Sequence, residues 1–405
     1  MDFDDTPEEA EFRLEVKNWL AEQAPAYNLK NVDDLSFEQR LSLGREFQAG
    51  KAERGYAKVT WPQELGGMGG TPMQAVIYDQ EEEKYNFPTL FFGISLGMPI
   101  PILRRFASEE QKKRYLIPAL RGEEIWCQLF SEPSAGSDLG GISLRAVREA
   151  DEWVLNGQKI WTSYAHISDF GVIVTRTDPS LPKHQGMTYF FVDMKSPGIE
   201  VRPIKQAAGS GEFCEVFFND VRIPDTARLG EINGGWPVAI ATLMEERLGV
   251  SEAAGGGASL ENTVRFLHRE FSDSQSGLND ACVREKIADW HVAESGINNF
   301  YARLLTGLSQ GQLPGPEAAL SKLVIARKLQ TQSSDIMDIC GPAGAIYPDS
   351  QVSRANDFRV AWLEAAGYRI AGGTDEILKN TIAERVLGLP GDIRVDKDIP
   401  FEKLK

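Results

Sequence analysis

Hydrophobic and polar positions divide the 405-residue chain into three stretches with different periods. Up to about residue 122, apolar residues recur every three to four positions, which predicts amphipathic helices. From Glu123 the period falls to about two, as in half-buried β-strands, and from Trp236 the helical period returns. Because strands do not alternate with helices, the pattern argues against a Rossmann fold. It predicts an α+β protein with three segregated parts.

We therefore expect an N-terminal α-helical domain over residues 1–122, a β-barrel or sandwich domain over 123–235, and a C-terminal α-helical domain over 236–405. Thr6 to Glu9 reads as a capping box with Pro7 at the first helical position, and Ser108 reads as another N-cap. Around the two prolines of residues 96–106, a helix is expected only from Pro101 onward. Strands are expected at 126–130, 144–149, 152–155, 159–162, 170–175, 188–192, 199–203 and 214–221. C-terminal helices are expected at 236–254, 258–271, 280–310, 316–338, 354–367 and about 375–387.

Two segments of the β region carry candidate chemistry. Residues 126–130 form an apolar run that is followed by a Gly/Ser-rich turn. Asn156-Gly157 lies between two further apolar runs, which predicts a β-hairpin with its turn there. Hydroxyl groups and the indole of Trp161 would then lie near one loop. Taken piece by piece, these features are also typical of a solvated loop.

Composition limits the classes of function. The chain is 42% hydrophobic and 25% charged, and no apolar run approaches the ~20 residues of a spanning helix. Its net charge of −16 argues against non-specific binding to nucleic acid or anionic membranes. The acidic N-terminus argues against a secretory signal and a transit peptide, so we expect a cytoplasmic protein. Its four cysteines are far apart, which suggests buried free thiols in a reducing compartment and neither disulfides nor a metal site.

As a pair, residues 128–133 and 161–163 resemble the flavin-binding segments of the acyl-CoA dehydrogenase family, and the resemblance extends over the whole chain. It implies an N-terminal α domain, a β domain and a C-terminal four-helix-bundle domain. It also implies FAD as cofactor. The flavin contacts implied in these segments are Gln128, Phe130, Ser131, Trp161 and Ser163. Ser137 matches a family position near the CoA chain, although a turn hydroxyl is an equally good interpretation.

The resemblance also bears on the catalytic base. Most members carry a glutamate in a loop whose matching position here is Gly372, while Thr374 and Glu376 match flavin contacts. Glu246 shares a helix face with apolar neighbours and precedes Arg247, as in isovaleryl- and long-chain-type members that place the base on this helix. Without the resemblance, an ion pair would explain Glu246 better. With it, we expect Glu246 to be the base and Arg247 and Gly372 to contact substrate.

Two motifs depart from the family pattern. The Arg-x-x-Phe motif that reaches a neighbouring subunit's FAD appears as His268 to Phe271, with histidine replacing the arginine. The adenine loop begins with Asp338 in place of glutamine and continues through Gly341. Both changes remove groups that would help to hold FAD. The resemblance therefore implies either a homotetramer or an α2β2 heterotetramer whose subunits complete each other's sites.

The expected reaction is desaturation of an acyl-CoA at Cα–Cβ to a trans-2-enoyl-CoA, with electron-transferring flavoprotein as acceptor. The backbone N–H of Gly372 would help to hold the thioester oxygen. Two alternatives remain open. One is a flavin monooxygenase or nitroalkane oxidase of related fold, and the other is a non-catalytic partner subunit of a heterotetramer.

Overall fold

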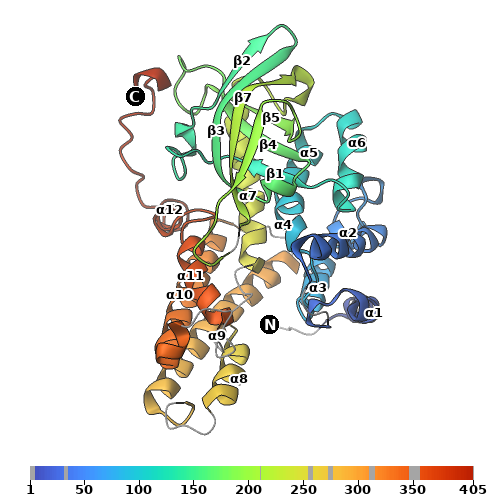
Figure 1. Ribbon diagram of the computed structural model, residues 1–405, viewed down its shortest axis with the longest axis vertical. Helices are drawn as coiled ribbons and strands as arrows, with labels where there is room; N and C mark the ends of the chain where they lie inside the picture. The colour runs from blue at the N-terminus through green and yellow to red at the C-terminus, as the bar shows by residue number, and fades with distance from the viewer. Residues whose placement is uncertain are drawn as a thin grey trace. The chain divides into compact units, whose positions relative to one another are not determined.

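The computed structural model describes residues 5–31, 35–209, 211–253, 259–271, 277–309, 315–345 and 356–404. The chain forms two compact units. The first contains residues 1–204, 211–245 and 394–405, and the second contains residues 205–210 and 246–393. The predicted order of helical, β and helical parts is confirmed (Figure 1). No helix in the described part of the chain is both long enough and apolar enough to span a bilayer.

The N-terminal helices are α1 (Pro7–Tyr27), α2 (Phe37–Glu53), α3 (Pro72–Glu82), α4 (Leu90–Gly97), α5 (Pro99–Phe106) and α6 (Glu109–Leu120). Side-chain caps begin four of them, α1, α2, α3 and α6. The predicted capping box at Thr6 and the N-cap at Ser108 are both confirmed. The expected start at Pro101 is wrong, because α5 begins at Pro99. Prolines fit there because the first turn of a helix has no partners for its N–H groups.

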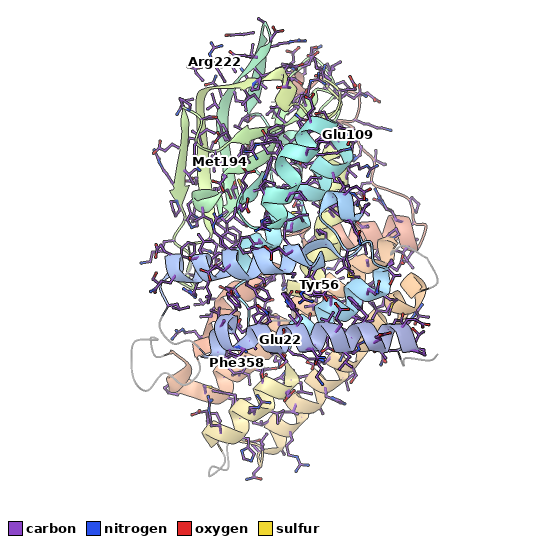
Figure 2. All side chains as sticks on the ribbon, turned by 90° about the vertical axis from the view of Figure 1, so that its right-hand side faces the viewer. Glu22, Tyr56, Glu109, Met194, Arg222 and Phe358 are labelled. Carbon is purple, nitrogen blue, oxygen red and sulfur yellow. The ribbon has the colours of Figure 1, made fainter. Side chains whose placement is uncertain are left out.

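The helices α1, α2 and α3 share an apolar core rich in aromatic rings. Trp19 stacks on Phe47 at 5.8 Å between ring centroids, and Tyr56 meets Trp19 edge-on at 5.2 Å. Figure 2 marks Tyr56 within this group of helices. Aromatic pairs of this kind fix the packing of helices beyond what buried area alone does.

The middle of the chain forms one curled sheet, and its described strands follow the order β1-β4-β2-β3-β7-β6, with β5 paired to β4 (Figure 1). The strands are β1 (Trp126–Leu129), β2 (Arg145–Glu149), β3 (Glu152–Ser163), β4 (Phe170–Arg176), β5 (Met187–Asp193), β6 (Ile199–Pro203) and β7 (Phe213–Pro224). The strand β1 stands at one end of this order, where it pairs in parallel with β4.

The predicted hairpin turn at Asn156-Gly157 is wrong. The strand β3 runs through these residues, and both of its halves pair with β7. The ladder shifts register between Leu155 and Gly157, which marks a β-bulge. Gly157 has φ +148°, and a Cβ there would come within 2.9 Å of Leu144. The side chain of Asn156 exchanges hydrogen bonds with Asp220, which is far away in the sequence. This contact holds Asn156 in the strand.

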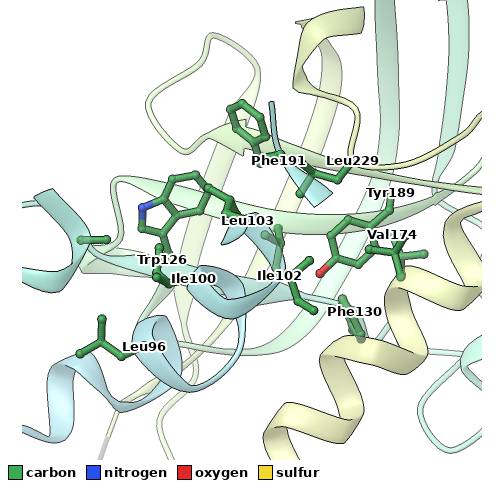
Figure 3. Packing of buried hydrophobic residues seen from close by; sticks show 14 of the residues in the cluster. Leu96, Ile100, Ile102, Leu103, Trp126, Phe130, Val174, Tyr189, Phe191 and Leu229 are labelled. Atoms are coloured by element: carbon green, nitrogen blue, oxygen red, sulfur yellow. The ribbon is translucent and has the colours of Figure 1, made fainter. Parts of the chain in front are cut away.

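A large apolar core joins one face of the sheet to α4, α5 and α6. Figure 3 shows Ile100, Ile102 and Leu103 of α5 packed towards Trp126 and Tyr189 of the sheet, all nearly inaccessible to solvent. Phe130 belongs to the same core, directly after β1. This core holds the end of β1 rigidly, and it therefore fixes where the residues after β1 begin.

The second unit is helical. After α7 (Gly235–Ala253), which begins in the first unit, it contains α8 (Leu260–Phe271), α9 (Ala281–Ser309), α10 (Ala319–Cys340), α11 (Asn356–Tyr368) and α12 (Asp375–Thr381). One apolar cluster includes Leu267, Trp290, Ile336 and Phe358, one from each of α8 to α11. Figure 2 labels Phe358 in this bundle.

The C-terminal stretch also belongs to the first unit. The C-terminal residues 394–404 lie on the loop before β5. There the Phe401 ring is buried against the Arg176 guanidinium, which lies 4.0 Å from the ring centroid, and Lys183 pairs with Asp396 at 2.5 Å.

The four cysteines are free, as predicted. The prediction that all four are buried is wrong, because Cys282 of the second unit is exposed. It lies on the first turn of α9.

Candidate functional site

The first candidate segment follows β1. Phe130 is buried, with its ring edge-on to Tyr189 at 5.8 Å, and Ser131 and Gln128 are partly exposed. A tight turn follows, in which Glu132 and Ala135 exchange backbone hydrogen bonds. Core packing therefore fixes Phe130, while the next residue reaches the surface.

The second segment is the end of β3. Trp161 is 55% exposed although it is a large aromatic residue, and its only ring partner in the described chain is Phe213, edge-on at 6.0 Å. Its φ of +60° lies in the left-handed region, and the β3–β7 ladder shifts register between Lys159 and Thr162. Strain of this kind costs about 1–3 kcal/mol and persists mainly at functional positions. An indole face presented to solvent beside the partly buried Ser163 fits a planar aromatic ligand.

The structure brings the two segments together. The Ile160 N–H donates to the Ser131 carbonyl at 2.9 Å, and the Lys159 ammonium donates to the Phe130 carbonyl at 2.9 Å. Residues separated by about thirty positions therefore form one edge, which carries Ser131, Trp161 and Ser163. These groups offer a stacking surface, hydroxyls and backbone polar groups, and they fit an isoalloxazine ring.

Sequence reasoning missed the buried ion pair behind this edge. Lys159 is 0% exposed, and its ammonium lies 2.9 Å from a carboxylate oxygen of Glu132, which is itself buried. The sequence includes Glu132 in the segment 128–133 that resembles a flavin-binding motif, and gives it no role of its own. A lysine in an apolar strand is the one signal in the sequence that could have indicated a buried acidic partner.

Ser137 lies in an exposed loop between the first segment and β2. The loop is anchored by the buried Arg176, whose guanidinium donates to the carbonyls of Gly140 and Ile142. Asp138 pairs with Lys183 at 3.1 Å, and Lys183 also pairs with Asp396 of the C-terminal stretch. The candidate substrate loop is thus held by residues from distant parts of the first unit.

In the second unit, the loop before α12 is braced on both sides. Gly372 and Gly373 have φ of +64° and +96°, and Thr374 caps α12 by accepting from the Ile377 N–H at 3.2 Å. Lys322 donates to the Gly373 carbonyl at 2.5 Å. The left-handed backbone at Gly372 disfavours any residue with a side chain. Glu376 is exposed on the first turn of the helix.

Asp375, between Thr374 and Glu376, is the buried carboxylate of this loop. One of its oxygens accepts from Arg369 at 2.6 Å and from Arg327 at 3.3 Å. Burial alone would raise the pKa of Asp375, but the two guanidiniums hold it below its ordinary value. Asp375 is therefore ionised and paired, so it fixes the loop, and its lowered pKa makes it a weak proton acceptor.

The remaining candidates are placed to different degrees. Glu246 and Arg247 lie on α7, but their side chains fall outside the described part of the chain. His268 is exposed and Phe271 is partly buried, and both lie at the C-terminal end of α8. Asp338 is exposed near the end of α10, and Gly341 follows that helix with φ +55°.

The ends of α8 and α10 lie close together, because Phe271 packs on the apolar cluster that contains Cys340. The structure therefore groups the two motifs that depart from the family pattern.

Comparison with known proteins gives three family matches in chain order. They are "Acyl-CoA dehydrogenase, N-terminal domain" over residues 6–123, "middle domain" over 127–221 and "C-terminal domain" over 233–387. Among curated relatives, the acyl-CoA dehydrogenase IpdE1 of Mycobacterium tuberculosis is 33% identical over 395 residues, which cover 95% of this chain and 98% of the relative.

Two further similarities are informative. The acyl-CoA dehydrogenase FadE34 of Mycobacterium tuberculosis is 36% identical over 348 residues, which cover 85% of this chain but only 46% of FadE34. The chain thus spans about half the length of that relative. A solved structure named Tcur3481-Tcur3483 steroid ACAD superposes with a TM-score of 0.80 at 26% identity, over 97% of this chain and 100% of the other.

Proposed function

Because the chain belongs to the acyl-CoA dehydrogenase family of FAD-dependent oxidoreductases, we propose that it desaturates an acyl-CoA thioester at Cα–Cβ to a trans-2-enoyl-CoA. The observation that carries this proposal is the joined edge of Ser131, Trp161 and Ser163, where an exposed indole under backbone strain lies beside hydroxyl groups. FAD, when bound, accepts the β-hydrogen as hydride. The edge supplies the surface on which the flavin ring would rest.

The same proposal assigns the other cofactor contacts. Gln128 in β1 and Phe130 directly after it are proposed as flavin contacts next to the joined edge. Thr374 and Glu376 of the loop before α12 are proposed as further flavin contacts. The grouped motifs His268, Phe271, Asp338 and Gly341 would contact the remainder of an FAD. The histidine and the aspartate are weaker partners for a diphosphate or an adenine than arginine and glutamine. A second, related subunit that completes the site would compensate for them.

We assign the role of general base to Glu246. Abstraction of an α-proton requires a carboxylate in a dry pocket that raises its pKa. The loop before α12 offers none at Gly372, whose φ of +64° favours a residue without a side chain. Its buried carboxylate, Asp375, is paired with two arginines that lower its pKa and so weaken it as a proton acceptor. The Gly372 N–H would hold the thioester oxygen as negative charge develops on it. Arg247 and Ser137 would contact the CoA part of the substrate.

Replacing Glu246 by glutamine tests this assignment. Glutamine keeps the shape of the side chain but cannot accept the proton, so turnover should fall by roughly 10²–10⁴-fold while FAD and acyl-CoA still bind. Glu245, one residue earlier, is the matched control because it points about 100° away on the same helix. Glu245→Gln should change turnover little. Near-normal turnover in Glu246→Gln, with loss of turnover in Glu376→Gln that still binds FAD, would place the base on the loop.

For the substrate, we propose an acyl group bulkier than a short straight chain, that is, branched, cyclic or steroid-like. Gly372 leaves space where most relatives have a glutamate side chain. Similarity to a structure named as a steroid acyl-CoA dehydrogenase supports the same direction. Electrons would pass to an electron-transferring flavoprotein.

A further inference from the structure

The ion pair of Lys159 and Glu132 is buried directly behind the joined edge. The Lys159 ammonium donates to Glu132 and to the Phe130 carbonyl, both at 2.9 Å. Glu132 also accepts from the Ser143 N–H at 2.6 Å, the Ser143 hydroxyl at 3.0 Å and the Leu144 N–H at 2.9 Å. Both carboxylate oxygens are therefore engaged, and the geometry of the pair is fixed by three neighbouring residues.

Stability alone does not account for such a pair. Desolvation of two charges offsets most of their attraction, and apolar replacements of buried pairs are often neutral or stabilising. Burial lowers the pKa of Lys159, and Glu132 only partly opposes that shift. Burial would raise the pKa of Glu132, but Lys159 and the two N–H groups hold it below its ordinary value. The arrangement is more readily explained by what the ammonium group orients.

That oriented group is the peptide unit between Phe130 and Ser131. The described chain contains no cis peptide bond, so the C=O and the N–H of this unit point to opposite sides. Because the carbonyl points inward to Lys159, the Ser131 N–H points away from the ion pair. None of the described residues accepts a hydrogen bond from this N–H. An ammonium group on the carbonyl also polarises the unit, which strengthens the N–H as a donor.

We propose that Lys159 is a positioning residue that orients and polarises the Phe130–Ser131 peptide unit, so that the Ser131 N–H donates to an acceptor atom of the flavin ring. This inference rests on the proposed function of the same site. A donor to the flavin ring favours the electron-rich reduced form. Lys159 therefore raises both the affinity for FAD and the midpoint potential of the bound flavin.

The test is the double variant Lys159→Met/Glu132→Gln, which removes both charges, leaves the net charge unchanged and lacks the donor to Phe130. We expect its FAD dissociation constant to rise at least tenfold and its flavin midpoint potential to become more negative. The matched control is Lys51→Met/Glu82→Gln, which removes a partly buried pair at 2.7 Å between α2 and α3. At a similar change in melting temperature, the control should keep both flavin properties.

A wild-type affinity and potential in the Lys159 double variant would overturn the inference. If that variant does not fold, Lys159→Gln/Glu132→Gln keeps a weaker, neutral amide donor and should still give a flavin midpoint potential more negative than that of the wild type. A wild-type potential there, or failure of both variants to fold, would show that the pair is structural only. If the wild-type chain, alone and with a related subunit, binds no FAD, the proposed function itself fails.

Discussion

At the scale of single residues, Trp161 is the side chain on which the proposal of FAD binding most depends. It combines a left-handed backbone with an exposed indole, and neither feature stabilises the first unit by itself. A stacked aromatic ligand would cover that surface and offset the strain.

Trp161→Ala should therefore leave the fold intact and raise the FAD dissociation constant by about tenfold, the equivalent of ~1.4 kcal/mol of lost stacking. Flavin fluorescence titration measures the change. The exposed Val147 of β2, 45% accessible, provides the control, since Val147→Ala removes exposed apolar surface away from the joined edge. Unchanged FAD binding by Trp161→Ala would remove the indole from the site.

The raised pKa of Asp79 in α3 predicts how the stability of the protein depends on pH. Burial, with the nearby Glu82 and despite Lys51, raises its pKa to about 6. The folded protein then binds more protons than the unfolded chain between about pH 4 and 6, so this residue lowers the free energy of unfolding as pH rises through that window. Asp79→Asn should gain about 1–3 kcal/mol at pH 7 and little at pH 4. Urea denaturation at both pH values measures the difference, and an equal effect at both would contradict the assignment.

At the scale of elements, the C-terminal stretch shows how distant segments fix one loop. The Phe401 ring lies against the Arg176 guanidinium, and the Phe401 N–H donates to the Leu181 carbonyl at 3.0 Å. Arg176 also donates to the Gly140 carbonyl in the loop that contains Ser137. A side chain near the end of the chain is thus connected to the candidate CoA loop by a single buried guanidinium.

Phe401→Ala should loosen this stretch by roughly 2 kcal/mol, somewhat less than the loss of a fully enclosed phenylalanine. Trypsin cleavage after Arg394 or Lys397 should accelerate about tenfold or more, because proteolysis follows the population of the open form. The exposed Glu402 is the control, and Glu402→Ala should be cleaved at the wild-type rate. Equal cleavage of all three proteins would mean that Phe401 does not anchor the stretch.

At the scale of the whole molecule, the exposed apolar side chains near residue 390 suggest that further chains cover them. Ile393 is 94% exposed, Val395 83% and Leu387 66%, which is unusual for a run of large apolar residues. Together with the weakened FAD motifs, this supports assembly into a tetramer of identical or of two related subunits.

Light scattering of the active protein should accordingly give a tetrameric mass, either for this chain alone or with a related subunit. Replacing Ile393 by aspartate should shift the mass towards smaller species, whereas the exposed polar residue Asp392 replaced by asparagine should not. A stable monomer with full activity would contradict the prediction.

A screen of acyl-CoA esters with a dye acceptor tests the substrate class, and a highest kcat/KM for butyryl-CoA would exclude the bulky substrate.

The sequence by itself determined the order of the parts and most of their elements, because these depend on local chemistry. Periods of 3.6 and 2 separate the helical and β stretches, and the caps at Thr6 and Ser108 satisfy orphan N–H groups within a few residues. Residues 128–133 and 161–163 could also be matched to a family as short linear motifs. The roles of Glu246 and of the other matched residues remain predictions.

Only the tertiary structure decided how those segments meet. Asn156-Gly157 is a turn signal within its own sequence, yet pairing of both halves of β3 with β7 makes it a bulge. Lys159 and Glu132 form a buried pair only because the sheet brings the end of β1 beside β3. The apolar strand around Lys159 indicates that a buried acidic partner exists, but not which residue it is. Local propensity depends on a few neighbouring residues and on small energies. Strand pairing and the burial of charge depend instead on contacts between residues far apart in the chain. Where local propensity and these long-range contacts conflict, the long-range contacts decide the structure.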